Sequence, residues 1–202
     1  MTQTRTEQDA AEQDAAELEE DGFDREAIER RQAALEHVRK YGDPVLRATA
    51  SPVTEFGVEL ERDLEQMGAL MDDAIGVGLS APQLGELRQL FVYRIPADED
   101  GEENPLVTVV NPQIEWSSEE TEVGEEGCLS LPLVRLSIER AARIRLRWQD
   151  PQGNEHVSKL DGLEARVAQH EIDHLNGVLI IDHVEGEERK TAIRALREAL
   201  DG

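Results

Sequence analysis

Helical hydrophobic stripes occur in four parts of this 202-residue chain. The clearest consists of apolar side chains that recur every three or four positions, namely Leu60, Leu64, Met67 and Met71. This spacing places them on one face of a helix that faces the core. Similar stripes predict a short helix that begins near Asp24, a helix between Asp161 and Gly177, and a last helix over about 187–200. Asp161 and Glu164 have the spacing of a capping box.

Between Leu87 and Leu160 the pattern changes to short runs rich in Val, Ile and Leu. The runs at 90–95, 106–110 and 144–148 are typical of antiparallel strands, several of them in a sheet with one face in water. A block of strands flanked by helices predicts an α+β fold.

Residues 1–36 differ in composition from the rest, because they carry twelve acidic side chains against four arginines. Such a segment buries little surface. We expect an acidic, solvated N-terminal extension over 1–36, disordered over 1–22 and partly helical after Asp24. Residues 37–202 have the length and the apolar content of one domain.

The net charge of −24 argues against binding to DNA or to anionic lipid, because the surface repels phosphate at long range. The sequence has no apolar run near the roughly 18 residues that span a membrane. The single cysteine, Cys128, makes no internal disulfide, which favours a cytoplasmic protein and a metal-binding or reactive thiol.

The segment His170–His174 reads H-E-x-x-H within a predicted helix. Two imidazoles four residues apart project from one helix face and can bind one cation. The alternative is a pair of solvated histidines, since the pattern also arises by chance. A hydrolytic metal needs about three protein ligands, and Cys128 in the segment 125–130 is the candidate for the third. A buried cysteine that acts as a small hydrophobe is the alternative.

A glycine-rich segment, 76–83, directly follows the predicted helix that carries Leu60 and Met71, and it ends in Gln83. It lacks both the Lys-Ser/Thr of a phosphate-binding loop and the third glycine of a dinucleotide fingerprint. A plain helix end followed by a loop is one interpretation. A backbone surface for a peptide substrate is the other.

Together, these three segments resemble the three motifs of peptide deformylases, which read approximately G-h-G-L-A-A-x-Q, E-G-C-L-S and H-E-x-D-H in this order. The resemblance covers about residues 38–185, with Ser80 where the family usually has alanine, an exchange from which we expect little effect. It implies antiparallel β-sheets packed around a central metal-binding helix, with a C-terminal helix. It also implies that residues 37–202 form a single catalytic domain.

The resemblance implies that Cys128, His170 and His174 hold one divalent metal ion, with Fe2+ native and Zn2+, Ni2+ or Co2+ able to substitute. A metal-bound water then attacks the formyl carbon of formyl-methionine at the N-terminus of a nascent protein and releases formate. Glu171 serves as general acid and base, and the Gln83 amide and the Leu129 backbone N–H stabilise the oxyanion. The residues that the resemblance places along the peptide are Val77, Gly78, Gly127, Arg135, Leu163 and Val167.

Several of these residues keep a plainer alternative. The apolar ones are equally well explained as core residues of a helix stripe, and Arg135 as an exposed strand residue. Asp173 is expected either to orient a neighbouring group from outside the metal's ligands or to be a surface carboxylate.

The last predicted helix has a basic side made of Arg189, Lys190, Arg194 and Arg197. The resemblance implies a substrate that is met as it leaves the ribosome, and with it this cluster predicts transient docking to the ribosome through this helix. A solvated face balanced by glutamates is the alternative. A weaker candidate for the same role is a cluster on a predicted strand, formed by Arg140, Arg143, Arg145 and Arg147.

Two other functions share the H-E-x-x-H signal. A zinc endopeptidase normally takes its third metal ligand from downstream of the helix, whereas Cys128 lies upstream. Glu185 and Glu187 lie downstream and could supply a carboxylate ligand, so this alternative stays open. A non-catalytic relative with a purely structural metal would need neither Glu171 nor Gln83.

Overall fold

The computed structural model describes residues 15–16, 18–19, 22–97 and 104–200. The helices are α2 (Arg25–Leu35), α3 (Val58–Asp73), α4 (Gly162–Leu175) and α5 (Gly186–Leu200), with the 3-10 turns η1 (Pro44–Arg47), η2 (Ala81–Leu84) and η3 (Ile180–Asp182). The strands are β1 (Gly78–Ser80), β2 (Leu90–Tyr93), β3 (Val107–Ser117), β4 (Thr121–Cys128), β5 (Leu131–Ala141), β6 (Arg143–Gln149) and β7 (Glu155–Asp161).

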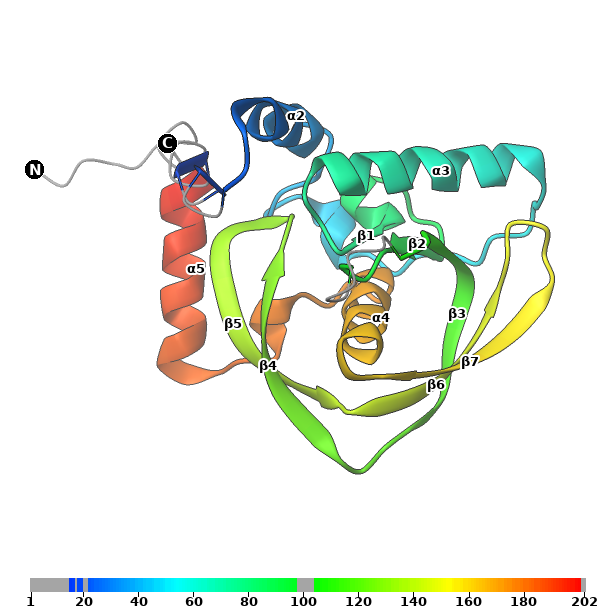
Figure 1. Cartoon of the computed structure of the whole chain (residues 1–202). Helices are drawn as coiled ribbons and strands as arrows, with labels where there is room; N and C mark the ends of the chain where they lie inside the picture. Colours follow the sequence, from blue (N-terminus) through cyan, green and yellow to red (C-terminus); the bar gives the residue numbers. More distant parts are fainter. Residues whose placement is uncertain (1–14, 17, 20–21, 98–103, 201–202) are drawn as a thin grey trace, which may run out of the picture.

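The strands form two antiparallel sheets around α4. One sheet has five strands in the order β1-β2-β3-β6-β7, and the other consists of β4 and β5. Figure 1 shows α4 in the space between the sheets, with α3 above the larger sheet and α5 beside β5. The predicted α+β class, the antiparallel strands and the central and C-terminal helices are confirmed.

The clearest predicted helix is α3, and its hydrophobic stripe is the buried face of this helix. Leu60, Leu64, Met67 and Met71 are all buried and belong to one core cluster with residues of β1 and β2. Because α3 lies against these strands, it fixes the backbone that leads into the glycine-rich segment. The pattern thus predicted both the helix and the face that it buries.

The start of α4 differs from the prediction. Asp161 is the N-cap residue, but its side chain makes no capping hydrogen bond. Glu164 does not face back to the cap, because its carboxylate accepts a hydrogen bond of 2.7 Å from the hydroxyl of Tyr93. The predicted capping box is therefore wrong, and a contact between α4 and β2 takes its place.

Helix α2 is part of the packed structure. Asp24 caps its N-terminus by accepting a hydrogen bond of 2.8 Å from the N–H of Ala27. Ile28 and Ala34 are buried, and the Arg31 guanidinium donates to the carbonyl oxygen of Ala74, just after α3. The helix that was predicted to begin near Asp24 is confirmed; two of its residues are buried, and most of the others are exposed. Most of 1–22 lies outside the described residues.

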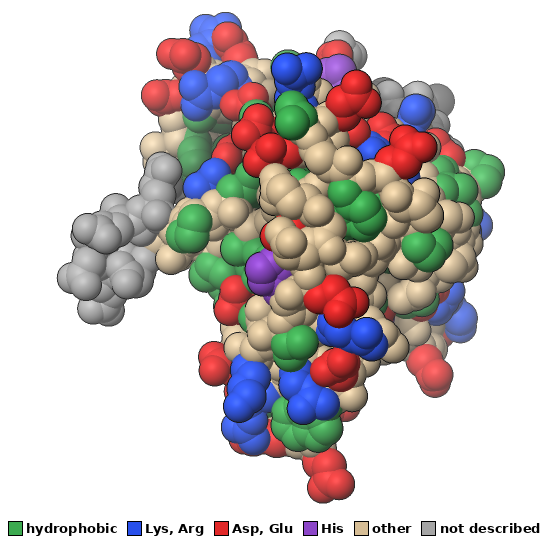
Figure 2. Space-filling view, turned by 90° about the vertical axis from the view of Figure 1, so that its right-hand side faces the viewer, with side chains coloured by type: hydrophobic (Ala, Val, Ile, Leu, Met, Phe, Trp, Pro, Cys, Tyr) green, Lys and Arg blue, Asp and Glu red, His purple; other side chains and the backbone are tan. Residues whose placement is uncertain are grey.

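The surface mixes charges of both signs. Figure 2 shows acidic and basic side chains next to one another on the face that it presents. Arg143, Arg145 and Arg147 on β6 pair with Glu120 and Glu115, so this strand is not a patch of unbalanced positive charge. Among the described residues, no helix has both the length and the apolar character that crossing a bilayer requires.

Gly177 directly follows α4, and replacing it tests whether the turn after this helix requires a glycine. Its φ is +72°, and a Cβ placed there would lie 2.6 Å from the carbonyl oxygen of Arg47. We expect Gly177→Ala to lower the free energy of unfolding by about 2–4 kcal/mol, because backbone strain and overpacking add. Urea unfolding followed by circular dichroism measures this change.

Gly186→Ala is the matched control, because Gly186 has a φ of +61° but a Cβ placed there would have no heavy atom within 4 Å. Its free energy of unfolding should fall only by the cost of the left-handed backbone conformation, about 1–2 kcal/mol. Equal losses in the two variants would contradict the steric argument at Gly177.

Candidate metal centre

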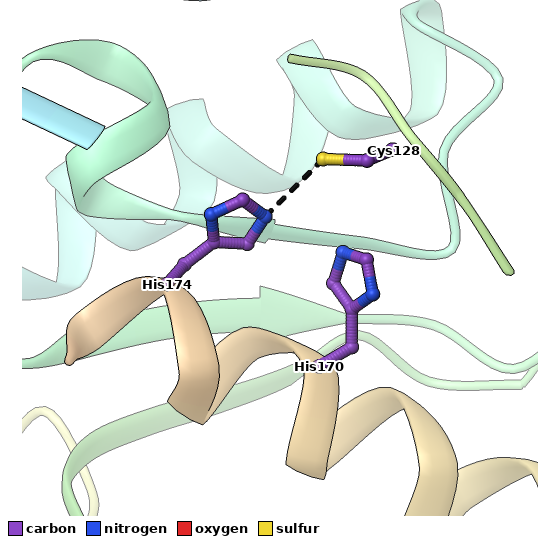
Figure 3. Close-up of side chains that lie close together, drawn as sticks. All are labelled: Cys128, His170 and His174. Carbon is purple, nitrogen blue, oxygen red and sulfur yellow. Dashed lines mark hydrogen bonds between the residues drawn. The ribbon is translucent and has the colours of Figure 1, made fainter. Parts of the chain in front are cut away.

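Three side chains from distant parts of the chain converge beside α4. Cys128 stands at the end of β4, where the pairing with β5 shifts register after Gly127, and His170 and His174 stand on one face of α4. One ligand atom from each of the three lies within 4.8 Å of the others, and Cys128 Sγ is 3.3 Å from His174 Nε2. Figure 3 shows the sulfur directed at the imidazoles. The predicted trio is therefore assembled.

The chemistry of these donors suits a divalent transition metal. One thiolate and two imidazoles are borderline-to-soft ligands, and three protein ligands are the number found in catalytic sites, whereas structural zinc sites use four. Burial alone would raise the pKa of Cys128, but the neighbouring His174 and His170 hold this pKa well below its ordinary value. The thiol therefore sits where its thiolate form is favoured.

Glu126 orients the first of the two histidines. Its carboxylate is buried and accepts a hydrogen bond of 3.0 Å from His170 Nδ1, which leaves Nε2 of that ring for a metal. Arg140 donates two hydrogen bonds of 2.9 Å to the same carboxylate, and Arg166 donates one of 2.8 Å. Burial would raise the pKa of Glu126, but Arg140 and His170 hold it below its ordinary value.

Arg140 was predicted to belong to a surface cluster, and this prediction is wrong. Its side chain is only 6% exposed and binds Asp173 as well as Glu126. Asp173 also lies 2.7 Å from His183 Nε2, so it orients neighbouring groups and is not a plain surface carboxylate. A sequence signal existed, because Arg140 falls in register with the inward positions Leu136 and Ile138 of β5.

Glu171 is buried beside the metal ligands. Burial raises the pKa of this carboxyl above its ordinary value, although the adjacent imidazoles oppose the shift. A Cβ at Gly78 would lie 2.4 Å from Glu171 Oε1, so the glycine is needed for the close approach of the loop. Within the described part of the chain, Glu171 Oε2 has no hydrogen-bond partner. The carboxylate is thus placed to exchange a proton with a bound molecule.

Gln83 is oriented by its own turn. Its Oε1 accepts hydrogen bonds of 2.9 Å from both the N–H and the hydroxyl of Ser80. The Nε2 end consequently faces the metal centre, 3.7 Å from Cys128 Sγ and 3.3 Å from Ser130 Oγ. The carbonyl oxygen of Leu129 accepts a hydrogen bond of 3.1 Å from Lys40 Nζ, which holds the peptide between Leu129 and Ser130.

A groove of about 880 Å³ opens over the metal centre. It contains Cys128, His170, Glu171, Gln83 and Leu129. The remaining residues that the sequence placed along a peptide also line it, namely Val77, Gly78, Gly127, Arg135, Leu163 and Val167. Residues of α2 and the end of α5 line it as well, which the sequence did not predict.

The family model described as polypeptide deformylase matches residues 35–190. The chain belongs to the polypeptide deformylase family. The peptide deformylase of Thermotoga neapolitana is 47% identical over 152 residues, which are 75% of this chain and 88% of that protein. The peptide deformylase of Acidothermus cellulolyticus is 44% identical over 166 residues, which are 82% of this chain and 88% of that protein.

Solved peptide deformylases share the fold. The crystal structure of the Thermotoga maritima enzyme is 46% identical, has a TM-score of 0.67 and covers 74% of this chain and 97% of its own. A Met-Ala-Ser-bound peptide deformylase from Acinetobacter baumannii is 35% identical, has a TM-score of 0.68 and covers 73% of this chain and 96% of its own.

Membership of this family makes the chain a metal-dependent hydrolase. Peptide deformylases act on nascent formyl-peptides and remove the N-formyl group, which places the chain in protein biosynthesis. The zinc endopeptidase and the non-catalytic relative that share the H-E-x-x-H helix are thereby set aside.

Replacing Glu126 tests its hold on the metal centre. In Glu126→Gln the amide no longer fixes the His170 ring as a charged acceptor does, so we expect metal affinity to fall by about 10- to 100-fold. Competition with a chromogenic chelator for Co2+ or Zn2+ measures it. Thermal unfolding is recorded in parallel, because the variant removes the Glu126 carboxylate from the buried Arg140 and from the half-buried Arg166.

The matched control is Glu125→Gln, the same exchange one residue earlier on an exposed side chain that is 3.8 Å from Arg135. It should retain the wild-type metal affinity. Equal affinity in the Glu126 variant and in this control would show that the carboxylate does not act on the ligand.

Proposed function

We propose that this chain hydrolyses the formyl amide of an N-terminal formyl-methionine and releases formate. The observation that carries the proposal is the meeting of Cys128, His170 and His174 beside a groove that is lined by Cys128, His170, Glu171 and Gln83. A structural metal site would need no carboxylate or amide aimed into a groove. The water oxygen joins the formyl carbon, the C–N bond breaks, and the amine leaves with a proton.

Cys128, His170 and His174 would hold one divalent ion, with Fe2+ native and Zn2+, Ni2+ or Co2+ able to replace it. When bound, such an ion polarises the formyl carbonyl and lowers the pKa of water toward about 7. The donor set supports a divalent transition metal at this site, because thiolate and imidazole bind all four of these ions.

Glu171 moves the protons of the reaction. It accepts one from the attacking water and delivers one to the departing amine. Its burial supports this role, because a raised pKa brings the carboxyl nearer to neutral pH, where a group can both take and give a proton. The close contact with Gly78 keeps the carboxylate facing the groove.

The oxyanion that forms on the formyl oxygen receives two donors from this chain, namely Gln83 Nε2 and the backbone N–H of Leu129. Gln83 is oriented before substrate binds by its hydrogen bonds from Ser80, and the hydrogen bond from Lys40 to the Leu129 carbonyl holds the peptide that follows the Leu129 N–H. Donors that are already oriented stabilise the charge of the transition state without reorganisation, and this is commonly the largest contribution to the rate enhancement.

Apolar side chains of the groove receive the methionine. Val77, Leu163 and Val167 line it on the side of α4, while Gly78, Gly127 and Arg135 contact the peptide backbone and its neighbours. Support for a peptide in this place comes from the bacterial relative whose crystal structure holds Met-Ala-Ser.

The site of action that fits this substrate is the cytoplasm, where nascent peptides emerge and a single thiol stays reduced. Residues 37–202 act as one catalytic domain in this proposal, and 1–36 precede it as an acidic extension. Neither DNA nor a membrane is a partner.

Formate release from formyl-Met-Ala-Ser is the test of this function. The enzyme, loaded anaerobically with Fe2+ or with Ni2+ or Co2+, should release one formate per peptide and leave acetyl-Met-Ala-Ser intact. A formate dehydrogenase assay follows the product. A metal-loaded enzyme that releases no formate would refute the proposal.

Glu171→Gln supplies the control for chemistry. It keeps the three metal ligands, so metal content should match the wild type, while turnover should fall by about 10²- to 10⁴-fold with the loss of proton transfer. Wild-type turnover in this variant would remove Glu171 from the mechanism.

We also propose transient docking to the ribosome through α5. Arg189 is engaged with Asp182 and the Ile181 carbonyl, and Lys190 with Glu187. Arg194 and Arg197 are exposed, and neither makes an ion pair within the described part of the chain. These two cations are therefore the ones available for RNA phosphates.

A double charge reversal, Arg194→Glu with Arg197→Glu, should abolish co-sedimentation with ribosomes at low salt. It is sharper than deletion of α5, because Leu196 of that helix belongs to the core. Reversal of Arg30, exposed on α2, is the control and should leave sedimentation unchanged. Binding that survives the double reversal would exclude this face.

A further inference from the structure

We propose that α2 and the last turn of α5 form a second subsite of the groove, which selects an apolar side chain downstream of the methionine. The inference rests on the proposed function for its substrate. It assigns a role to α2, of which only Leu35 falls within the family match over residues 35–190, and to the last turn of α5, which lies outside that match.

The first observation is continuity with the metal centre. Arg31, Gln32 and Leu35 of α2 and Ala199 and Leu200 of α5 line the same cavity as the metal ligands. At about 880 Å³ it lies in the upper part of the roughly 300–1,000 Å³ that ligand sites span. One formyl-methionine fills only a part of this volume, so the rest is available to the following residues of the peptide.

The second observation is that both walls are anchored. Arg31 binds the Ala74 carbonyl, and the next residue, Ile75, has a φ of +55° where the chain turns into the glycine-rich segment. Leu196 and Ala199 of α5 are buried. Figure 1 shows α2 and the end of α5 at the same end of the molecule. Side chains on fixed helices discriminate between substrates better than side chains on a mobile tail.

The third observation is the chemistry of the lining. The segment that follows Cys128 lines the same cavity with Leu131, Pro132, Leu133 and Val134. Leu35 and Leu200 face the same cavity. These apolar side chains, beside the polar Arg31, Gln32 and Glu36 of the same lining, favour a Leu-like side chain over a polar one, because burial removes apolar surface from water.

The test compares formyl-Met-Ala-amide with two longer peptides, formyl-Met-Ala-Leu-Leu-amide and formyl-Met-Ala-Ser-Ser-amide. The wild-type enzyme should prefer the Leu-Leu peptide over the Ser-Ser peptide in kcat/KM by about five-fold or more. Gln32→Trp places a bulky ring in the subsite. It should lower kcat/KM for the Leu-Leu peptide by about five-fold more than for formyl-Met-Ala-amide, a steric effect of ordinary size.

Ala33→Trp is the matched control, because Ala33 is the next residue of α2, is exposed and does not line the groove. It should keep wild-type kcat/KM for all three peptides. A second variant, Leu200→Ser, should reduce the preference for Leu-Leu over Ser-Ser. An unchanged preference in both groove variants, or an equal fall for the short and long peptides, would overturn the subsite.

A binding readout separates this inference from the proposed function. The indole introduced by Gln32→Trp should change its fluorescence when the formyl-free peptide Met-Ala-Leu-Leu-amide is added, whereas that of Ala33→Trp should not. This result needs no turnover. Absence of formate release from formyl-Met-Ala-amide would refute the function alone, and absence of the fluorescence difference would refute the subsite alone.

Discussion

The buried carboxylate of Glu126 is the interaction on which the rest of this structure depends. It stands on β4 and accepts hydrogen bonds from Arg140 of β5 and from Arg166 and His170 of α4. Buried charges are costly unless they are paired, so these groups stabilise only the arrangement in which all of them meet. Cys128 lies two residues further along β4. The same contact that joins the small sheet to α4 therefore brings the thiolate to the imidazoles.

The parts of this arrangement that the sequence predicted are those with a local or repeated signal. The α3 stripe has helical spacing, and His170 and His174 share a helix face because they are four residues apart. Cys128 stood out as the only cysteine. The order of the three motifs then supplied the family. None of these inferences required knowledge of which elements pack together.

The parts that could not be predicted depend on tertiary pairing. In the sequence, Arg140 has the appearance of a surface cation. In the structure, alternate residues of β5 face inward, and Arg140 binds Glu126 of β4 and Asp173 of α4. Likewise, Glu164 leaves the predicted capping box because the Tyr93 hydroxyl offers a partner across the core. Composition alone also gave no sign of the packing of α2, which buries Ile28 and Ala34 and contacts α3. Helical stability in proteins comes mainly from such packing.

Ser80 shows how a small difference from the family motif changes the chemistry next to the metal. An exchange of alanine for serine leaves the volume of the turn almost unaltered, and on that ground the sequence predicted little effect. The structure adds that the hydroxyl donates to Gln83 Oε1 alongside the Ser80 N–H. With alanine, one donor would hold this oxygen; with serine, two do. Because an amide that is held at its oxygen presents its nitrogen in a fixed direction, the hydroxyl strengthens the preorganisation that the proposed oxyanion role of Gln83 requires.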